Sequence, residues 1–118
     1  MAAKKSSANK KLLLYTRKKI YKDIKKDLLE QLELNGTLGA FYTDLIDDYM
    51  DFWVTKCMLI EDIHERGPTV EYDNGGGQKG KKKNDSIEQL IKVNAQMMRI
   101  LSEIGIKPSD SVGDESDL

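Results

Sequence analysis

Residues 40–66, AFYTDLIDDYMDFWVTKCMLIEDIHER, carry the longest helical pattern of this sequence, and Gly67-Pro68 closes it. The second half of this segment, residues 52–60, is apolar on nearly every side of the predicted helix. A helix that is apolar all round must be covered from more than one direction, and this short chain offers few elements to cover it. We therefore expect part of the helix to contact another copy of the protein. The candidate oligomerisation residues are Tyr49, Phe52, Trp53, Met58 and Ile60.

The segment before it, residues 15–35, predicts a shorter amphipathic helix. At about 100° per residue, apolar side chains fall on one face and lysines on the opposite face. The apolar face comprises Ile20, Tyr21, Ile24, Leu28 and Leu32, and the basic face comprises Lys18, Lys19, Lys22, Lys25 and Lys26. Asn35-Gly36 supplies the left-handed residue with which helices commonly end.

A third helix is predicted over residues 86–104. Asp85 is its expected N-cap, and Glu88 three residues later completes a capping box. Apolar residues at helical spacing form a stripe along one face of this helix, and one polar residue, Asn94, lies within it. The apolar members are Ile87, Leu90, Ile91, Met97, Met98, Leu101 and Ile104. A buried Asn94 would either fix the register of packed helices or bond a backbone carbonyl, and the sequence favours neither. Gly105 ends the helix.

Residues 69–84, between the second and third helices, lack the helical periodicity of apolar residues. Residues 69–72 alternate like a short strand and a glycine-rich turn follows, so we expect a small basic hairpin or loop. This segment is either a basic finger or a surface loop without a role. The run GGGQKGK at 75–81 matches most of a phosphate-binding loop, but Lys82 stands where a serine or threonine should hold Mg²⁺. We predict no nucleotide site and no cofactor.

The 118 residues leave room for one domain, and the fold class they predict is all-α. No apolar run approaches the roughly 20 residues of a membrane span, and the single cysteine excludes an internal disulfide, so we expect a soluble intracellular protein. Its three main helices lie at about 15–35, 40–66 and 86–104, with the small hairpin between the last two. We expect a disordered basic arm over 1–14, a helical domain over 15–107 and a disordered acidic tail over 108–118.

Charge is segregated along the chain, although the net charge is only -1. Residues 1–30 hold ten lysines and arginines against three acidic residues, whereas residues 31–66 hold two against eight. Because lysines near phosphates release counterions, the basic head suits a polyanionic partner; the alternative is that these lysines merely solvate an arm and a helix face. The candidate DNA-binding residues are Arg17, Lys18, Lys19, Lys22, Lys25, Lys26, Lys79, Lys81, Lys82 and Lys83.

The sequence offers no catalytic or metal-binding set. Cys57 and His64 share a helix face but lie about 10 Å apart along its axis, which is too far for a thiolate-imidazole pair. The four aspartates of the long helix have helical spacing, yet metal sites normally draw ligands from several elements. They are Asp44, Asp47, Asp48 and Asp51, and we expect them to form a solvated face or a partner surface. We predict that the protein is not an enzyme and binds no metal.

The order of these features resembles a known family. A basic helix stops at Asn35-Gly36, a long helix carries Tyr49 and Trp53, a Gly/Lys hairpin follows, and the last helix closes with LSEIGIKP at 101–108. This order resembles the small terminase subunits of tailed double-stranded DNA phages, in the group with a Leu-Gly-Leu-x-Pro type C-terminal signature. The resemblance covers about residues 20–110.

Two positions depart from the family pattern. Asn84-Asp85 stands where Asn-Pro is expected before the last helix, and this keeps the capping function without the proline. An acidic tail follows Pro108 where basic residues are usual. This tail is therefore a candidate contact for another protein rather than for DNA.

The resemblance implies a non-enzymatic subunit that assembles into a ring in the host bacterial cytoplasm. Such a subunit binds viral double-stranded DNA at the packaging-initiation region. It also regulates the large terminase subunit, which carries the ATPase and nuclease activities. A ring repeats each lysine ridge, so weak phosphate contacts add through avidity. The alternative is a small helical oligomeric adaptor that binds protein partners and has no DNA role. DNA binding in modest salt discriminates between the two.

Overall fold

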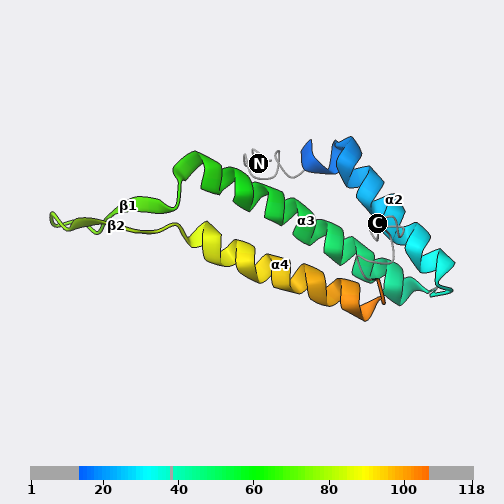
Figure 1. Ribbon diagram of the computed structural model, residues 1–118. Helices are drawn as coiled ribbons and strands as arrows, with labels where there is room; N and C mark the ends of the chain where they lie inside the picture. The colour runs from blue at the N-terminus through cyan, green and yellow to red at the C-terminus, as the bar shows by residue number, and fades with distance from the viewer. Residues whose placement is uncertain (1–13, 38, 107–118) are drawn as a thin grey trace, which may run out of the picture.

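The computed structural model describes residues 14–37 and 39–106. Its elements in chain order are α2 (Lys19–Leu34), α3 (Ala40–Arg66), β1 (Thr69–Asp73), β2 (Lys79–Lys83) and α4 (Asp85–Glu103) (Figure 1). The second and third predicted helices are confirmed to within one residue, and the segment between them is an antiparallel hairpin. The basic arm, apart from Leu14, and the acidic tail lie outside the described residues.

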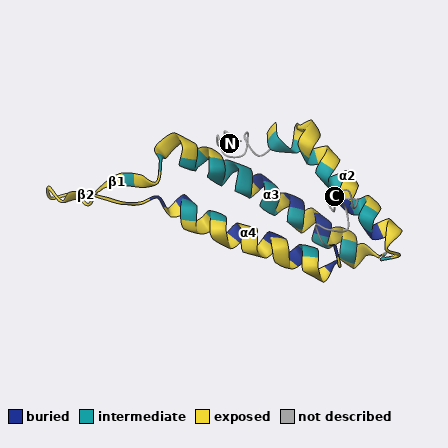
Figure 2. Cartoon of the chain, in the orientation of Figure 1, coloured by how far each residue is buried: buried dark blue, intermediate teal, exposed yellow. Residues whose placement is uncertain are grey.

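The long helix α3 is the centre of the fold. Figure 1 shows α4 running back beside α3, the two strands extending this helix pair at one end, and α2 lying along the N-terminal half of α3. The buried positions lie on the facing sides of the helices (Figure 2). The core cluster comprises Leu28 and Leu32 of α2, Ile46 and Met50 of α3, and Ile104 and Ile106 after α4. In the described ranges no helix is long and apolar enough to span a membrane.

The first predicted helix is interrupted near its start, so a continuous helix over 15–35 is wrong. Residues 14–17 form a helical turn, Lys18 is extended (φ -71°, ψ 147°), and α2 begins at Lys19. The break brings the Tyr15 ring edge-on to Trp53 of α3, with ring centroids 6.4 Å apart, and Tyr21 meets the same indole at 5.9 Å. Such aromatic pairs contribute about 0.5–1.5 kcal/mol beyond burial, so this tertiary contact overrides the local helix preference.

Two helices end as their glycines predict. Gly36 and Gly105 have φ angles of 72° and 78°. In each case the next N–H donates to the carbonyl five residues back, at 2.9 Å: Thr37 to Leu32, and Ile106 to Leu101. This is the Schellman helix stop, which is completed after α4 by burial of Ile106. The LSEIGI part of the C-terminal segment therefore ends a helix and returns an aliphatic side chain to the core.

The start of α4 differs from its prediction. The N-cap is Asn84, not Asp85, because the Asn84 side-chain oxygen accepts a hydrogen bond from the Ser86 N–H at 2.9 Å. With the cap one residue earlier, Glu88 no longer occupies the capping-box position. The Asn84 side chain is wholly buried, so its burial and its other hydrogen bonds decide which residue caps the helix.

The buried face of α4 is also rotated from the predicted stripe. Its buried residues are Ser86, Val93, Met97 and Ile100. Ile91 and Met98 are 64% and 55% exposed, and Asn94 is exposed as well. Because α4 packs mainly on α3, one narrow face is enough to bury it; Ile91 and Met98 lie outside this face, whereas Ile87, Leu90 and Leu101 are half-buried at its edges. Neither role predicted for a buried Asn94 applies within one chain.

Candidate nucleic-acid interface

Helix α2 presents a row of lysines to solvent. Its apolar side chains Leu28 and Leu32 are buried in the core, which turns the opposite face outward. Lys22 and Lys26, one turn apart, are exposed, and Lys25 is half-buried beside them. All three border a shallow hollow of about 410 Å³, whose full lining is Thr16, Tyr21, Lys22, Lys25, Lys26, Leu29, Glu30 and Glu33. Three of the five lysines of the predicted ridge therefore border one hollow along α2.

Some of the predicted DNA-binding side chains already have partners. Lys19 Nζ donates to Asp23 at 2.6 Å, and this hydrogen bond and charge raise the pKa of Lys19. Lys25 Nζ lies 3.2 Å from an Asp47 carboxylate oxygen of α3. Within the described residues, Lys22 and Lys26 have no acidic partner. Their charges are therefore the ones most available to a polyanion.

At the N-terminal end of α2, two further candidates flank the helix break. Lys18 Nζ lies 4.6 Å from the centroid of the Tyr15 ring, a cation-π contact at the surface. Arg17 belongs to the short turn before the break and is exposed. Neither residue lines the hollow that Lys22, Lys25 and Lys26 border.

The hairpin divides its lysines between two faces. The antiparallel register pairs Thr69 with Lys83, Glu71 with Lys81, and Asp73 with Lys79. Paired residues share a face, so two of these three lysines lie directly opposite a carboxylate that offsets their charge. Lys82 lies on the other face, opposite Val70, and its Nζ is 3.7 Å from Asp85. The hairpin is therefore less basic as a surface than its sequence indicates.

Gly80 of the hairpin lies under the ring of Tyr72, its partner in the register. A Cβ atom at position 80 would lie 2.6 Å from the Tyr72 hydroxyl oxygen and 2.7 Å from the ring carbon that bears it. Glycine leaves the space in which this ring lies flat across the strand. The glycine in the KGKKK strand thus has a packing role.

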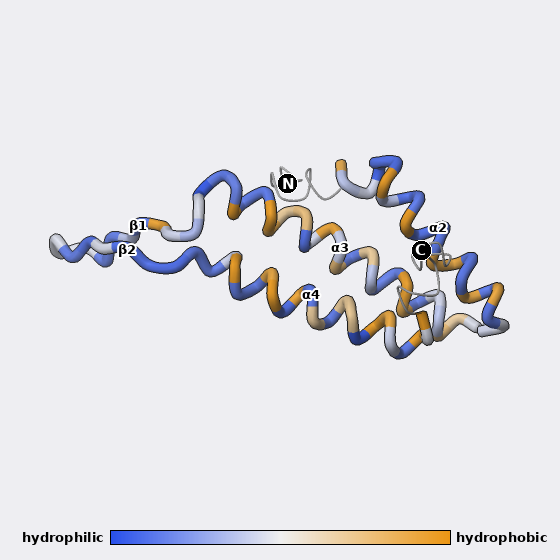
Figure 3. The backbone as a smooth tube through the Cα atoms, in the orientation of Figure 1, coloured by the Kyte–Doolittle hydropathy of each residue, from blue (hydrophilic) through white to orange (hydrophobic). Residues whose placement is uncertain are grey.

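The structure does not bring the two basic groups together. The hairpin projects from the end of the α3–α4 pair, whereas α2 lies along the N-terminal half of α3 (Figure 1). Figure 3 shows hydrophilic residues along β2 and, separately, on the turns of α2. One chain therefore presents two separate basic surfaces, and on the α2 surface Lys22 and Lys26 have no acidic partner within the described residues.

The predicted oligomerisation residues are all half-buried in the single chain. Tyr49 and Trp53 pack against the core cluster that α2 helps to form, and burial raises the pKa of the Tyr49 hydroxyl. Phe52 borders a separate hollow with Asp48, Asp51 and Thr55. Together with Met58 and Ile60, Phe52 remains partly open to a neighbour, whereas Ile46, Met50 and Val54 are the fully buried positions of α3.

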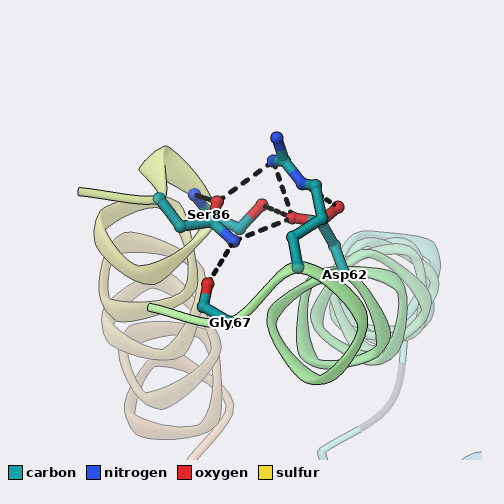
Figure 4. Close-up of polar contacts among 5 residues, drawn as sticks. Asp62, Gly67 and Ser86 are labelled. Carbon is teal, nitrogen blue, oxygen red and sulfur yellow. Dashed lines mark hydrogen bonds and ion pairs between the residues drawn. The ribbon is translucent and has the colours of Figure 1, made fainter. Parts of the chain in front are cut away.

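A polar cluster at the base of the hairpin has no counterpart among the sequence predictions (Figure 4). The Asn84 side chain donates from Nδ2 to the Gly67 carbonyl at 3.0 Å and to Asp62 at 3.3 Å. Arg66 binds both oxygens of Asp62, at 2.7 and 2.8 Å, and also donates to Asn84 Oδ1 at 3.1 Å. The Ser86 hydroxyl donates to Asp62 at 2.6 Å.

This cluster fixes the direction in which the hairpin leaves the helices, because it joins the last turn of α3 to the first turn of α4. The hydrogen bond from Arg66, followed by that from Ser86, holds the pKa of Asp62 far below its ordinary value. The sequence contained two of its signals, the Asp62 and Arg66 spacing of one helical turn and an asparagine before a helix. Nothing in the sequence indicated that these residues meet.

The fold is a helical hairpin with a basic helix on its flank, and in the described ranges no group of three or more His, Cys, Asp or Glu could hold a metal ion. Its distinctive features are the charged surfaces of α2 and of the hairpin.

Comparison of the sequence with models of known protein families identifies the family of this chain. The model of the family described as phage terminase, small subunit, matches residues 18–112, and the chain belongs to this family. The match confirms the family resemblance and supports a role in phage packaging; small terminase subunits are generally non-catalytic. It does not confirm the C-terminal signature at 101–108. Neither the search of curated proteins nor the search of solved structures found a match.

Proposed function

We propose that this terminase small subunit binds viral double-stranded DNA through the exposed lysine face of α2 and regulates the large terminase subunit during packaging in the host bacterial cytoplasm. The observation that carries the DNA-binding part is the row of Lys22, Lys25 and Lys26 along one hollow of α2. Lys22 and Lys26 have no acidic partner among the described residues, so their full positive charge is available to attract a phosphate.

The contact is made to phosphates rather than to base edges. Base-specific contacts in the major groove are made most often by arginine, asparagine and glutamine side chains. The exposed face of α2 instead carries lysines, with Arg17 at its edge. Lysine is a flexible point charge and holds a phosphate without selecting a base. Binding through α2 is therefore weakly sequence-dependent and strongly salt-dependent.

The hairpin supplies a second and weaker contact in this proposal. Lys79 and Lys81 have Asp73 and Glu71 opposite them, and Lys82 lies near Asp85. Lys83, opposite Thr69, is the lysine of the hairpin without a carboxylate in its register. The hairpin and α2 lie toward opposite ends of the folded molecule. They would therefore contact separate stretches of the DNA, or the hairpin of one subunit would act beside the α2 of an adjacent subunit.

The assembly we propose is a closed ring, in which the half-buried apolar residues of α3 and the exposed ones of α4 meet neighbouring chains. Ile91 and Met98 lie on the outward face of α4, and each is more than half exposed in the single chain. A ring repeats the α2 surface once per subunit. Several modest phosphate contacts then act together, because binding through one subunit raises the effective concentration of the next.

Fluorescence anisotropy with a labelled double-stranded DNA fragment tests the proposal. The logarithm of the association constant should fall linearly with the logarithm of salt concentration, by about 0.9 for each phosphate contact. Titrations between about 50 mM and 200 mM salt cover the range in which this loss is largest. Absence of binding at the lowest salt would contradict the proposal and favour the adaptor that binds proteins alone.

A further inference from the structure

A groove of about 450 Å³ opens between α2 and the C-terminal end of α4. Both helices pack mainly on α3, so the space between them keeps an apolar lining that faces solvent. Its apolar residues are Ile24 and Leu28 of α2, Tyr49 of α3, and Leu101 and Ile106 at the end of α4. Among the residues of the described ranges, no segment fills it.

Two carboxylates border this groove on the side of α2. Asp27 and Glu30 are exposed, one turn apart, and line the groove together with Gln31. Asp23, one turn earlier, is bound by Lys19, but Asp27 and Glu30 have no ion pair within the described residues. Unpaired acids beside an apolar lining fit a segment that places lysines next to leucines.

The chain itself carries such a segment. Residues 10–14 are KKLLL, two lysines followed directly by three leucines. Leu14, where the described part of the chain begins, is 58% exposed. The next residue, Tyr15, already packs on Trp53, so Leu14 is held at the surface of its own chain without an apolar partner in the core.

We propose that residues 10–14 of one copy occupy the groove between α2 and α4 of a second copy. Lys10 and Lys11 then face Asp27 and Glu30, and the leucines cover Ile24 and Leu101. This inference rests on the proposed oligomeric assembly and names one contact that builds it. Because the contact joins two different surfaces, it can repeat head to tail from one subunit to the next, and such a heterologous interface closes into a ring when the rotation between subunits permits.

Charge reversal tests this contact between chains. One variant carries Lys10→Glu with Lys11→Glu, and the other carries Asp27→Lys with Glu30→Lys. Each variant alone places like charges at the groove, so its mass by light scattering falls from the wild-type value toward the 13.4 kDa of one chain. An equimolar mixture places opposite charges at every mixed contact, so its mass should rise again above that of either variant alone. Far-UV circular dichroism of each variant establishes that the helices are retained.

The matched control is Glu33→Lys with Glu65→Lys, which makes the same charge change on exposed residues outside the groove. Its mass should stay at the wild-type value. A monomeric wild type would overturn the oligomeric assembly and this inference together. If the wild type is oligomeric but both groove variants keep its mass, or lose it without recovery on mixing, the groove contact alone is overturned. DNA binding, measured separately by anisotropy, reports on the α2 surface.

Discussion

The hydroxyl of Ser86, in the first turn of α4, donates a hydrogen bond of 2.6 Å to the carboxylate of Asp62, in the last turns of α3. The two residues lie 24 positions apart and on either side of the hairpin. An isolated two-stranded hairpin is marginally stable at best in water. The side chains at its base therefore determine where it points, and through it where its lysines can reach.

Replacing Asn84 by alanine should lower the free energy of unfolding by about 1–3 kcal/mol, because it leaves the Gly67 carbonyl and the Ser86 N–H without their partner in a buried site. Urea unfolding followed by circular dichroism measures this loss. Asn94→Ala is the matched control, since Asn94 is exposed on the same helix, and its effect should stay within about 0.5 kcal/mol. Equal effects at the two positions would show that the polar cluster adds nothing to stability.

The Asp62 carboxylate should make stability depend on pH in the acid range. Its folded-state pKa is depressed by Arg66 and Ser86, so its contribution is complete above the ordinary aspartate pKa of about 3.9 and is lost as pH falls below it. Wild type and Asp62→Asn should therefore differ most near neutral pH, and the difference should shrink steadily as pH falls from about 3.9 toward the depressed folded-state pKa. Urea midpoints measured across this range check the convergence. Parallel curves would mean that the depressed pKa does not contribute to folding.

Gly105→Ala should destabilise the fold by about 1–2 kcal/mol, because a left-handed backbone is costly for a residue with a Cβ atom. Gly105 has φ 78° and no atom near its Cβ position, so the cost is conformational rather than steric. Gly105→Asn is the comparison, since asparagine tolerates this conformation better. Thermal unfolding should rank wild type first, the asparagine variant second and the alanine variant last. An alanine variant as stable as the asparagine variant would contradict this account of the helix stop.

The parts of the fold that were predictable from sequence are those set by neighbours along the chain. The long apolar segment of α3, the glycines at 36, 67 and 105, and the turn before β2 each act locally, and each appears where expected. The antiparallel hairpin follows from the same local signals. Its register, and with it the pairing of Glu71 and Asp73 with lysines, does not follow from those local signals.

The parts that were missed depend on contacts between distant segments. The break at Lys18 is favoured by Trp53, which is remote in sequence, and the cap at Asn84 is decided by Gly67 and Asp62. The outward position of Ile91 and Met98 follows from the single face that α4 presents to α3. A periodic pattern identifies a helix and its apolar stripe, but the packing partner selects which part of that stripe is buried.

The same limit applies to the candidate DNA surface. From the sequence, ten lysine and arginine residues were equivalent candidates for DNA binding. The structure separates them into two groups, one at α2 and one on the hairpin, and places acidic side chains beside several of them. Lys25 is an example: it lies on the ridge, but its ammonium group is beside Asp47 of α3. A substitution at Lys25 would change both DNA binding and the packing of α2, so the decisive test leaves it unchanged.

The most direct test compares the DNA affinity of two charge-matched variants, Lys22→Glu with Lys26→Glu on α2 and Lys81→Glu with Lys83→Glu on the hairpin. Anisotropy titrations at one fixed salt concentration should show a loss of affinity of at least about tenfold for the α2 variant. Titrations repeated at several salt concentrations should show its salt slope reduced by about 1.8, since each lost phosphate contact removes about 0.9. The hairpin variant should lose less, and light scattering should give both variants the wild-type mass. Equal losses, or a larger loss for the hairpin variant, would contradict the assignment of DNA binding to α2.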